Sequence, residues 1–293
     1  MAAASKSKKI GRRAFKPGVE ISIIGFGAIV VMGHEQPEAN QIVAEAVERG
    51  VNYFDAAPTY GKGEAETKLG EALKPFRKQS FLACKTGKSN AVQAEQSLQE
   101  SLKRLQTDHF DLFQLHGVGS MDEAKKFLAP GGAGEYFRKI KEQGLTKYLG
   151  FSAHSAEAAV FLMDNFPFDS VLFPLNYVMV VQGNFGPQIL AKAKEKGITR
   201  LALKALCLRP WPEGVEKNYP KCWYQPIEEP KLQSLAMRYT LSEDVTAAIP
   251  PGDIRLWRPA MDLAAAFTPL TPAERAGLLE TAKEHSALFA AGV

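Results

Sequence analysis

Eight short apolar runs, rich in β-branched and aromatic residues, alternate with stretches of helical period along most of the chain. The helical stretches 37–50 and 187–197 end on glycine, which suits the left-handed turn that stops a helix. Such alternation is typical of βα units, so the sequence predicts an α/β fold with a parallel sheet. The strand candidates are residues 20–27, 51–55, 80–84, 110–116, 147–152, 170–176, 199–206 and 245–250.

Eight units without a doubled nucleotide-binding pattern or an internal linker favour a closed barrel over an open doubly wound sheet. The 293 residues, 45% of them hydrophobic, are enough for one large core. We therefore expect a (β/α)8 TIM barrel with a long rim loop after the seventh strand and a C-terminal helix from Thr271 to about Ala290. The barrel forms a single domain over residues 17–293, and residues 1–16 form a basic, flexible N-terminal segment.

Charge and cysteine content narrow the class of protein. Six of the 36 Lys and Arg residues precede the first acidic residue, Glu20, so the net charge of +4 belongs to a tail and indicates no nucleic-acid surface. The apolar run 21–32 is too short to span a bilayer. Cys84, Cys207 and Cys222 are too few and too scattered for disulfides, a zinc finger or an iron–sulfur cluster. A protein of the reducing cytoplasm, without metal or membrane, is expected.

Three consecutive predicted strands close on a polar group. Asp55 ends the second strand, Lys85 follows the third, and His116 ends the fourth. A single such residue is commonly a cap or a surface group, but burying unpaired charges costs several kcal/mol unless they have partners or a task. Because the carboxyl ends of the strands share one rim of a parallel barrel, we expect these side chains to meet in one site.

Tyr60 lies five residues after Asp55, on the loop above the second strand. A free phenol has a pKa of about 10 and is a poor proton donor or acceptor near neutrality. We expect the Lys85 ammonium to lower that pKa, Asp55 to orient Lys85, and His116 to hydrogen-bond a substrate oxygen or relay a proton. The alternative is a loop tyrosine packed against a glycine turn.

Three motifs, DAAPTYG, ACKTG and FDLFQLHG, resemble in order and spacing the Asp and Tyr, Lys, and His motifs of the aldo-keto reductases. The likeness extends from about Gly11 to the last helix. It implies a (β/α)8 barrel that binds a nicotinamide cofactor in extended form, and the cofactor supplies the hydride for the reaction. Tyr60 is then the general acid, Lys85 and Asp55 tune it, and His116 positions the carbonyl group.

The resemblance also implies cofactor contacts along the rim. GFSAHS and LALKAL are similar to a bacterial branch of the family, some of whose members carry an iron–sulfur module for which this chain lacks the cysteines. Leu203 and Lys204 replace the usual aromatic and serine. Pro251 and Gly252 stand where Lys and Ser or Thr are common, so the basic cluster that grips a 2′-phosphate is incomplete. Arg255 or Arg258 is then expected to meet that phosphate, and NADP(H) is favoured over NAD(H) without being fixed. The implied contacts are Gly27, Ala28, Asp55, Ser152, Asn176, Lys204, Ala205, Leu206, Pro250, Gly252, Asp253, Arg255 and Arg258.

The irregular stretch 209–230 is the main candidate for shaping the substrate site. One interpretation is that its aromatic residues form a stiff lid over a substrate that is apolar or sugar-like. The other is that they pack against one another as the hydrophobic core of the loop itself. The expected reaction is reduction of the carbonyl of an aldehyde, ketone or ketosugar-like compound, or the reverse. The candidate pocket residues are Ile29, Val30, Trp211, Tyr219, Trp223 and Tyr224.

Two other functions compete with this prediction. A metal-dependent isomerase or hydrolase would use Asp55, His116 and His154 as ligands, but the Lys85 ammonium would repel a cation at the same rim. The second competing function is a sensor or regulatory barrel that binds the cofactor but turns over weakly, since fold does not dictate function. No feature demands a protein partner, so a monomer or a weak homo-oligomer acting on a small molecule is expected.

Overall fold

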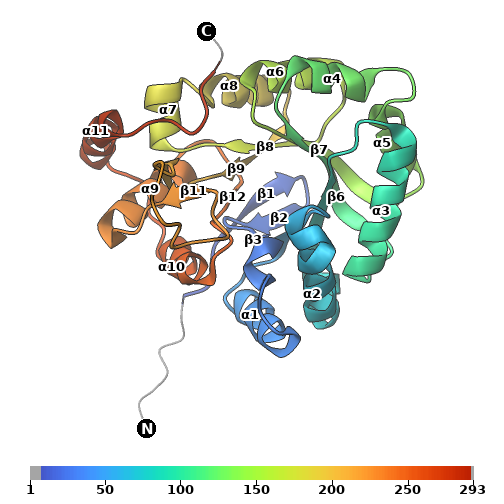
Figure 1. Cartoon of the computed structure of the whole chain (residues 1–293), viewed down its shortest axis with the longest axis horizontal. Coiled ribbons are helices and arrows are strands. Elements are labelled where there is room, and N and C mark those ends of the chain that lie inside the picture. Colours follow the sequence, from blue (N-terminus) through green and yellow to red (C-terminus); the bar gives the residue numbers. More distant parts are fainter. Residues whose placement is uncertain (1–7, 292–293) are drawn as a thin grey trace.

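The computed structural model describes residues 8–291 and shows eight parallel strands around one axis, with helices outside them (Figure 1). Neighbouring strands pair in parallel in chain order, and an isolated parallel bridge from Ile24, just before the first barrel strand, to Ala248 of the last strand closes the ring. The predicted (β/α)8 barrel is thereby confirmed. Its strands are β3 (Phe26–Gly27), β4 (Tyr53–Asp55), β5 (Phe81–Thr86), β6 (Phe110–Val118), β7 (Thr146–Ala153), β8 (Ser170–Pro174), β9 (Thr199–Leu203) and β12 (Ala247–Ile249).

Several of the helices that surround the barrel begin at a side-chain cap. Asn90, Ser120 and Ser155 each accept a hydrogen bond from a backbone N–H in the first turn of the following helix, which satisfies donors that the helix itself leaves free. The helices are α1 (Gln36–Glu48), α2 (Glu64–Leu73), α3 (Ala91–Leu105), α4 (Met121–Leu128), α5 (Ala133–Glu142), α6 (Ala156–Asn165), α7 (Tyr177–Gly183), α8 (Pro187–Glu195), α9 (Pro230–Ser242), α10 (Ile254–Ala265) and α11 (Pro272–Thr281). Shorter 3-10 turns are η1 (Ala28–Val31), η2 (Tyr60–Gly63), η3 (Lys74–Gln79) and η4 (Ala282–Glu284).

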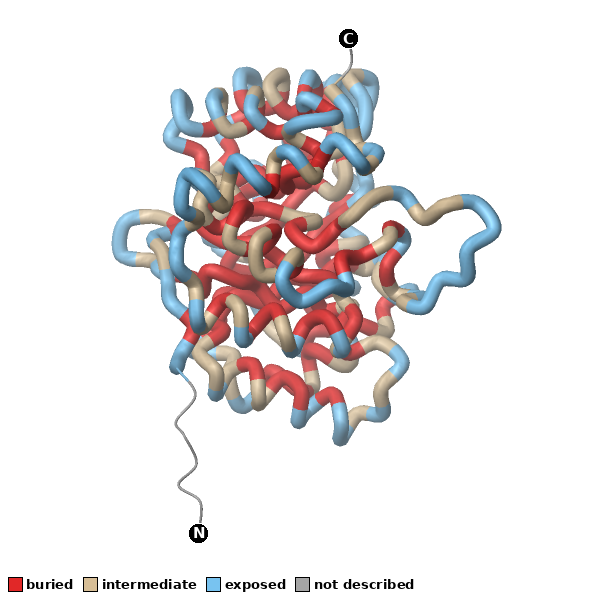
Figure 2. Tube along the Cα trace, turned by 90° about the vertical axis from the view of Figure 1, so that its left-hand side faces the viewer, coloured by how far each residue is buried: buried red, intermediate tan, exposed pale blue. Residues whose placement is uncertain are grey.

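An antiparallel hairpin of β1 (Arg12–Lys16) and β2 (Val19–Ser22) closes the amino end of the barrel. Phe15 and Ile21 of the hairpin are buried in one apolar cluster with strand residues such as Tyr53, Leu112 and Leu201. A second and larger cluster lies between the strands and the helices, and buried chain fills the middle of the molecule (Figure 2). Because the amino end is packed, ligands have access from the carboxyl end.

Two predictions for the N-terminal part were wrong in detail. Residues 20–27 are not one strand, since β2 pairs with β1 whereas β3 pairs with β4. Gly25 lies between them, where a Cβ would stand 2.6 Å from the Tyr53 ring. Residues 12–16, expected to be flexible, form β1. The rest of that predicted segment, 1–7, lies outside the described residues.

The C-terminal part also differs from its prediction at three places. The seventh barrel strand ends at Leu203 because Lys204 adopts a left-handed φ of 67°. The irregular stretch that follows contains an antiparallel pair, β10 (Cys207–Pro210) and β11 (Tyr224–Pro226). The last helix, α11, ends at Thr281, one 3-10 turn follows, and the chain then runs on without helix instead of remaining helical to about Ala290.

Candidate active site

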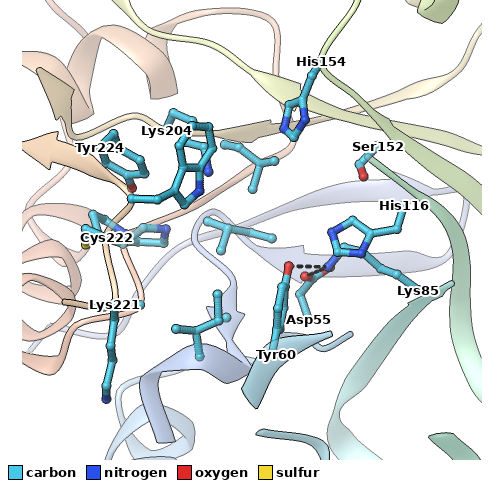
Figure 3. A pocket seen from close by; sticks show the side chains of 18 residues that line it. Asp55, Tyr60, Lys85, His116, Ser152, His154, Lys204, Lys221, Cys222 and Tyr224 are labelled. Atoms are coloured by element: carbon cyan, nitrogen blue, oxygen red, sulfur yellow. Dashed lines mark hydrogen bonds and ion pairs between the residues drawn. The ribbon is translucent and has the colours of Figure 1, made fainter. Parts of the chain in front are cut away.

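A cavity of about 150 Å³ opens at the carboxyl end of the barrel (Figure 3). The strand ends and the loops after them supply its walls, as the topology of a parallel barrel requires. All four residues expected to carry the chemistry, Asp55, Tyr60, Lys85 and His116, line it. The other lining residues are Gly27, Ile29, Ser152, His154, Leu203, Lys204, Lys221, Cys222, Trp223, Tyr224, Ile249, Pro250, Pro251 and Gly252.

Asp55 and Lys85 form a buried ion pair on adjacent strands. Lys85 Nζ donates to Asp55 Oδ1 and lies 3.4 Å from the Tyr60 hydroxyl oxygen. The second carboxylate oxygen, Oδ2, accepts hydrogen bonds from Tyr53 Oη at 3.2 Å and from Gln114 Nε2 at 3.1 Å. Three donors therefore hold the Asp55 carboxylate in place, and the carboxylate in turn holds the ammonium beside the phenol.

The pKa shifts show which protons these groups keep. Burial by itself lowers the pKa of Lys85, but the Asp55 carboxylate, with smaller contributions from Tyr60 and Cys84, outweighs it, and the net pKa is raised, so the ammonium persists. Burial raises the pKa of Tyr60, and the Lys85 ammonium opposes this without cancelling it. The expected lowering by Lys85 is present, but the prediction of a lowered net pKa was wrong for the protein alone. Tyr60 keeps its proton at neutral pH, the state that a proton donor needs.

His116 faces Tyr60 across the cavity, with ring centroids 5.7 Å apart and an interplanar angle of 88°. Burial, together with the charges of Lys85, His154 and Lys204, lowers the pKa of His116 to about 3. The imidazole is therefore neutral at physiological pH. Within residues 8–291 neither of its ring nitrogens has a hydrogen-bond partner, so an N–H is free to donate to a ligand.

Ser152 and Lys204 are the polar cofactor candidates that reach the cavity, besides Asp55. Ser152 Oγ accepts a hydrogen bond from the Gly117 N–H at 2.7 Å, which leaves its hydroxyl hydrogen to donate. The Lys204 ammonium lies 4.6 Å from the ring centroid of Trp223 and 4.9 Å from that of Tyr224. Burial lowers the pKa of Lys204 to about 8, and the described part of the chain offers it no carboxylate within ion-pair distance.

Asn176, another predicted cofactor contact, does not line the cavity. Its Nδ2 donates to the backbone oxygens of Lys204 and Cys207, both at 3.0 Å. Its Oδ1 accepts from the Met179 N–H at 2.8 Å and caps α7. The amide is thus engaged in holding the chain at Lys204. Three further predicted contacts are buried away from the cavity lining: Ala28, Ala205 and Leu206.

The predicted phosphate-side residues lie at the start of α10, outside the cavity lining. Asp253 caps the helix through the Arg255 N–H at 3.0 Å and pairs with the Arg255 guanidinium at 2.8 Å. Arg255 also lies 4.4 Å over the ring of Tyr219. Arg258 pairs with Glu45 at 3.0 Å. Both arginines are exposed, and an incoming phosphate would have to share each guanidinium with the carboxylate already paired to it.

Of the aromatic residues in the 209–230 stretch, some line the cavity, as a lid would, and others pack within the loop; the sequence left both interpretations open. Trp223 and Tyr224 line the cavity, and Trp223 is 52% exposed. Trp211 instead donates to the Cys222 carbonyl at 2.8 Å, and Tyr219 donates to Glu228 at 2.9 Å, so these two hold the loop itself.

The first rim loop divides in the same way. Ile29 lines the cavity, whereas the Val30 side chain is buried and its carbonyl accepts a hydrogen bond from Lys221 Nζ at 3.1 Å. The sequence placed His154 in the site only as a metal ligand of the competing function, because it follows closely on a predicted strand, as Lys85 does. Five other lining residues were not assigned to the site: Leu203, Lys221, Cys222, Ile249 and Pro251.

Neither a metal centre nor a membrane span is found in the described part of the chain. Residues 8–291 contain no group of three or more His, Cys, Asp or Glu side chains placed to hold a metal ion. They also contain no helix with the length and apolar character needed to cross a bilayer. The metal-dependent alternative finds no support in this geometry, since Asp55 is occupied by Lys85.

Comparison with known proteins finds similarity to one enzyme family and to several of its curated members. The Aldo/keto reductase family matches residues 23–208, more than half of the chain. L-galactose dehydrogenase of Arabidopsis thaliana is 29% identical over 68% of this chain and 66% of its own length. Aldo-keto reductase YhdN of Bacillus subtilis is 28% identical over 65% of this chain and 60% of its own length. The aligned segments thus span less than two thirds of either relative.

Solved structures agree over a larger share of the chain. The holo form of aldo-keto reductase AKR11C1 from Bacillus halodurans has 25% sequence identity and a TM-score of 0.74, covering 95% of this chain and 98% of its own. Glycerol dehydrogenase AKR11B4 from Gluconobacter oxydans shares the fold, with 22% identity, a TM-score of 0.69 and 97% of each chain covered. The motif resemblance, the family match and the barrel agree: the chain belongs to the aldo-keto reductase family.

Proposed function

We propose that this protein is a nicotinamide-dependent oxidoreductase that reduces the carbonyl group of a small aldehyde, ketone or ketosugar-like compound, or catalyses the reverse reaction. The observation that carries the proposal is the linked set Asp55, Lys85 and Tyr60, which opens onto a cavity beside the neutral His116. The name of one relative, L-galactose dehydrogenase, fits oxidation and reduction at a carbon that carries oxygen.

The four residues divide the work. His116 donates a hydrogen bond to the carbonyl oxygen and polarises it, which its neutral state and free ring nitrogens permit. Tyr60 delivers its proton to the same oxygen as negative charge develops there. The Lys85 ammonium, 3.4 Å away, stabilises the phenolate that remains. Asp55 keeps that ammonium charged and in position.

The residues present fit a dinucleotide. When bound, the nicotinamide supplies the hydride. The observation that supports the fit is the Lys204 ammonium, which lines the cavity and has no acidic partner in the described chain. Its charge is therefore available to pair with the pyrophosphate. We expect the Ser152 hydroxyl, whose oxygen accepts from the Gly117 N–H, to donate to the amide oxygen of the nicotinamide. At the start of α10, the exposed Arg255 and Arg258 favour NADP(H) over NAD(H) through a 2′-phosphate.

Titration with each cofactor followed by turnover tests the proposal. Protein and cofactor fluorescence should change on mixing with NADPH, and less steeply with NADH, and the complex should then reduce members of a panel of aldehydes, ketones and ketosugars. Absence of binding by both cofactors would remove the oxidoreductase assignment. Binding with negligible turnover across the panel would favour a sensor or regulatory barrel instead.

A further inference from the structure

His154 is a second imidazole in the cavity, and the chemistry described above does not use it. It follows the last residue of β7, and its backbone N–H donates to the Val118 carbonyl at 2.8 Å. The side chain lines the same cavity as His116 and points toward it from the next strand end (Figure 3). A ligand that fills this cavity from the Tyr60–His116 pair toward β7 would therefore meet His154.

Two aromatic side chains, Phe289 and Trp223, pack against the ring of His154. The Phe289 ring stacks on it at a centroid distance of 4.6 Å and an angle of 6°. Trp223 meets it edge-on at 6.4 Å and contacts Phe289 at 5.8 Å. Phe289 therefore covers one face of the imidazole, and neither aromatic contact is a hydrogen bond to a ring nitrogen. Neither nitrogen has a hydrogen-bond partner among residues 8–291.

The protonation state of His154 decides which group its edge can bind. Burial, reinforced by the Lys204 charge and opposed by Glu123, lowers the pKa of His154 to about 4. At neutral pH the ring therefore offers one donor and one acceptor. A hydroxyl group, which also donates and accepts, complements such an edge. An alkyl chain would leave a half-buried imidazole without a partner, which costs free energy.

The size of the cavity limits the substrate. A protein cavity of roughly 150 Å³ holds a molecule such as benzene. The cavity here has about that volume and is lined also by Ser152 and Lys204, which we assign to the cofactor, so the part left to the substrate suits only a small molecule. We propose that His154 hydrogen-bonds a hydroxyl group one or two carbons away from the reacting carbonyl, and so makes the site selective for small hydroxylated aldehydes and ketones. This inference rests on the proposed carbonyl reduction. The exposed face of Trp223 provides an apolar surface for the carbon chain of the same substrate.

The test compares two three-carbon aldehydes, glyceraldehyde and propanal, which differ by two hydroxyl groups. The wild-type protein should show a higher kcat/KM for glyceraldehyde. His154→Phe keeps a ring that can stack on Phe289 but removes both nitrogens, and it should lower kcat/KM for glyceraldehyde at least tenfold more than for propanal. His154→Asn, which retains a donor and an acceptor, should recover part of that selectivity. Hydration of each aldehyde cancels when variants are compared on the same substrate.

A matched control is His34→Phe, because His34 lies outside the cavity and pairs with Glu38 at 3.0 Å. It should leave both kcat/KM values unchanged. An equal loss on both aldehydes in His154→Phe, or no preference for glyceraldehyde in the wild type, would overturn the inference and assign His154 to packing. Failure of the proposed function looks different, since the wild type would then turn over neither aldehyde with either cofactor; that result would overturn both proposals.

Discussion

Two buried aspartates at opposite ends of the barrel show how the same side chain serves different purposes. Asp111, at the amino end, accepts hydrogen bonds from the Leu82 N–H at 2.9 Å, from Arg77 at 3.0 Å and from Lys147 at 2.7 Å. Its cationic partners reach the surface, and Lys147 is 59% exposed. The three side chains that donate to Asp55, at the carboxyl end, are all buried: Lys85, Tyr53 and Gln114.

The difference lies in what each carboxylate holds. Asp111 ties the starts of β5, β6 and β7 together and does not line the cavity at the carboxyl end, so its charge stabilises the fold. Asp55 fixes an ammonium that lines a cavity, so its charge serves a ligand. An ion pair is therefore informative about function when it borders a cavity and its charges cannot be screened by water. Variants at each end should separate stability from activity.

The largest effect is expected for Lys85→Met, because it leaves the Asp55 carboxylate buried without its cation. Breaking a buried pair by removing one partner costs about 3–5 kcal/mol, and loss of the ammonium should also abolish most carbonyl reduction. Denaturant unfolding and steady-state rates measure the two effects. The double variant Asp55→Asn with Lys85→Met should regain stability without regaining activity; recovery of activity would contradict the assigned role.

Asp111→Asn should lower stability by about 2 kcal/mol, the range for a hydrogen-bonded charge, and leave kcat nearly unchanged. Burial raises the pKa of Asp111, but the Leu82 N–H, Lys147 and Arg77 outweigh it, and the net pKa is lowered. Because the folded pKa of Asp111 lies below the unfolded pKa of about 3.9, its ionised carboxylate stabilises the folded protein fully above that pH. This contribution is lost as pH falls through the folded pKa. The wild-type advantage over Asp111→Asn in urea unfolding should therefore shrink below about pH 4. A large fall in kcat would erase the contrast between the two ends.

Lys204→Gln should weaken cofactor binding about tenfold, which corresponds to about 1.4 kcal/mol. Since the pKa of Lys204 is lowered to about 8, its positive charge is complete below that pH and is lost above it. Cofactor affinity of the wild type, measured by fluorescence titration, should fall as pH rises through 8, whereas the affinity of Lys204→Gln should change less. Identical pH profiles would show that Lys204 does not contact a phosphate.

The smallest effect is expected for Arg258→Ala, because Glu45 already neutralises this exposed guanidinium. Exposed ion pairs contribute about 0–1 kcal/mol, so affinity for NADPH should fall by about fivefold at most, with affinity for NADH unchanged. Equal changes for the two cofactors would remove Arg258 from the 2′-phosphate site. The same pair of titrations on Arg255→Ala tests the second arginine.

The elements with local signals could be predicted from the sequence. Apolar runs that close on Asp55, Lys85 and His116 indicated both the strands and the members of the cavity, because the topology of a parallel barrel brings successive strand ends to one rim. Tyr60 followed from its spacing to Asp55. Neither inference required knowledge of contacts between distant segments.

The remaining features depend on such distant contacts. The last helix gave no sign of ending at Thr281, but the chain beyond it packs Phe289 on His154 and bonds the Ala291 N–H to the Gly183 carbonyl at 2.8 Å; tertiary contacts of this kind override helix propensity. The net pKa of Tyr60 depends on burial, which spacing does not reveal. The engagement of Asn176 with the chain at Lys204 is likewise invisible in sequence.

Comparison of Tyr60→Phe with the wild type tests the central claim most directly. The variant keeps the ring and loses only the hydroxyl group, so the cofactor dissociation constant should stay within about twofold while kcat for carbonyl reduction falls by about 10²–10⁴, the usual contribution of a general acid. A variant that binds the cofactor and reduces carbonyl compounds at the wild-type rate would contradict the assignment of Tyr60 and the account built on it.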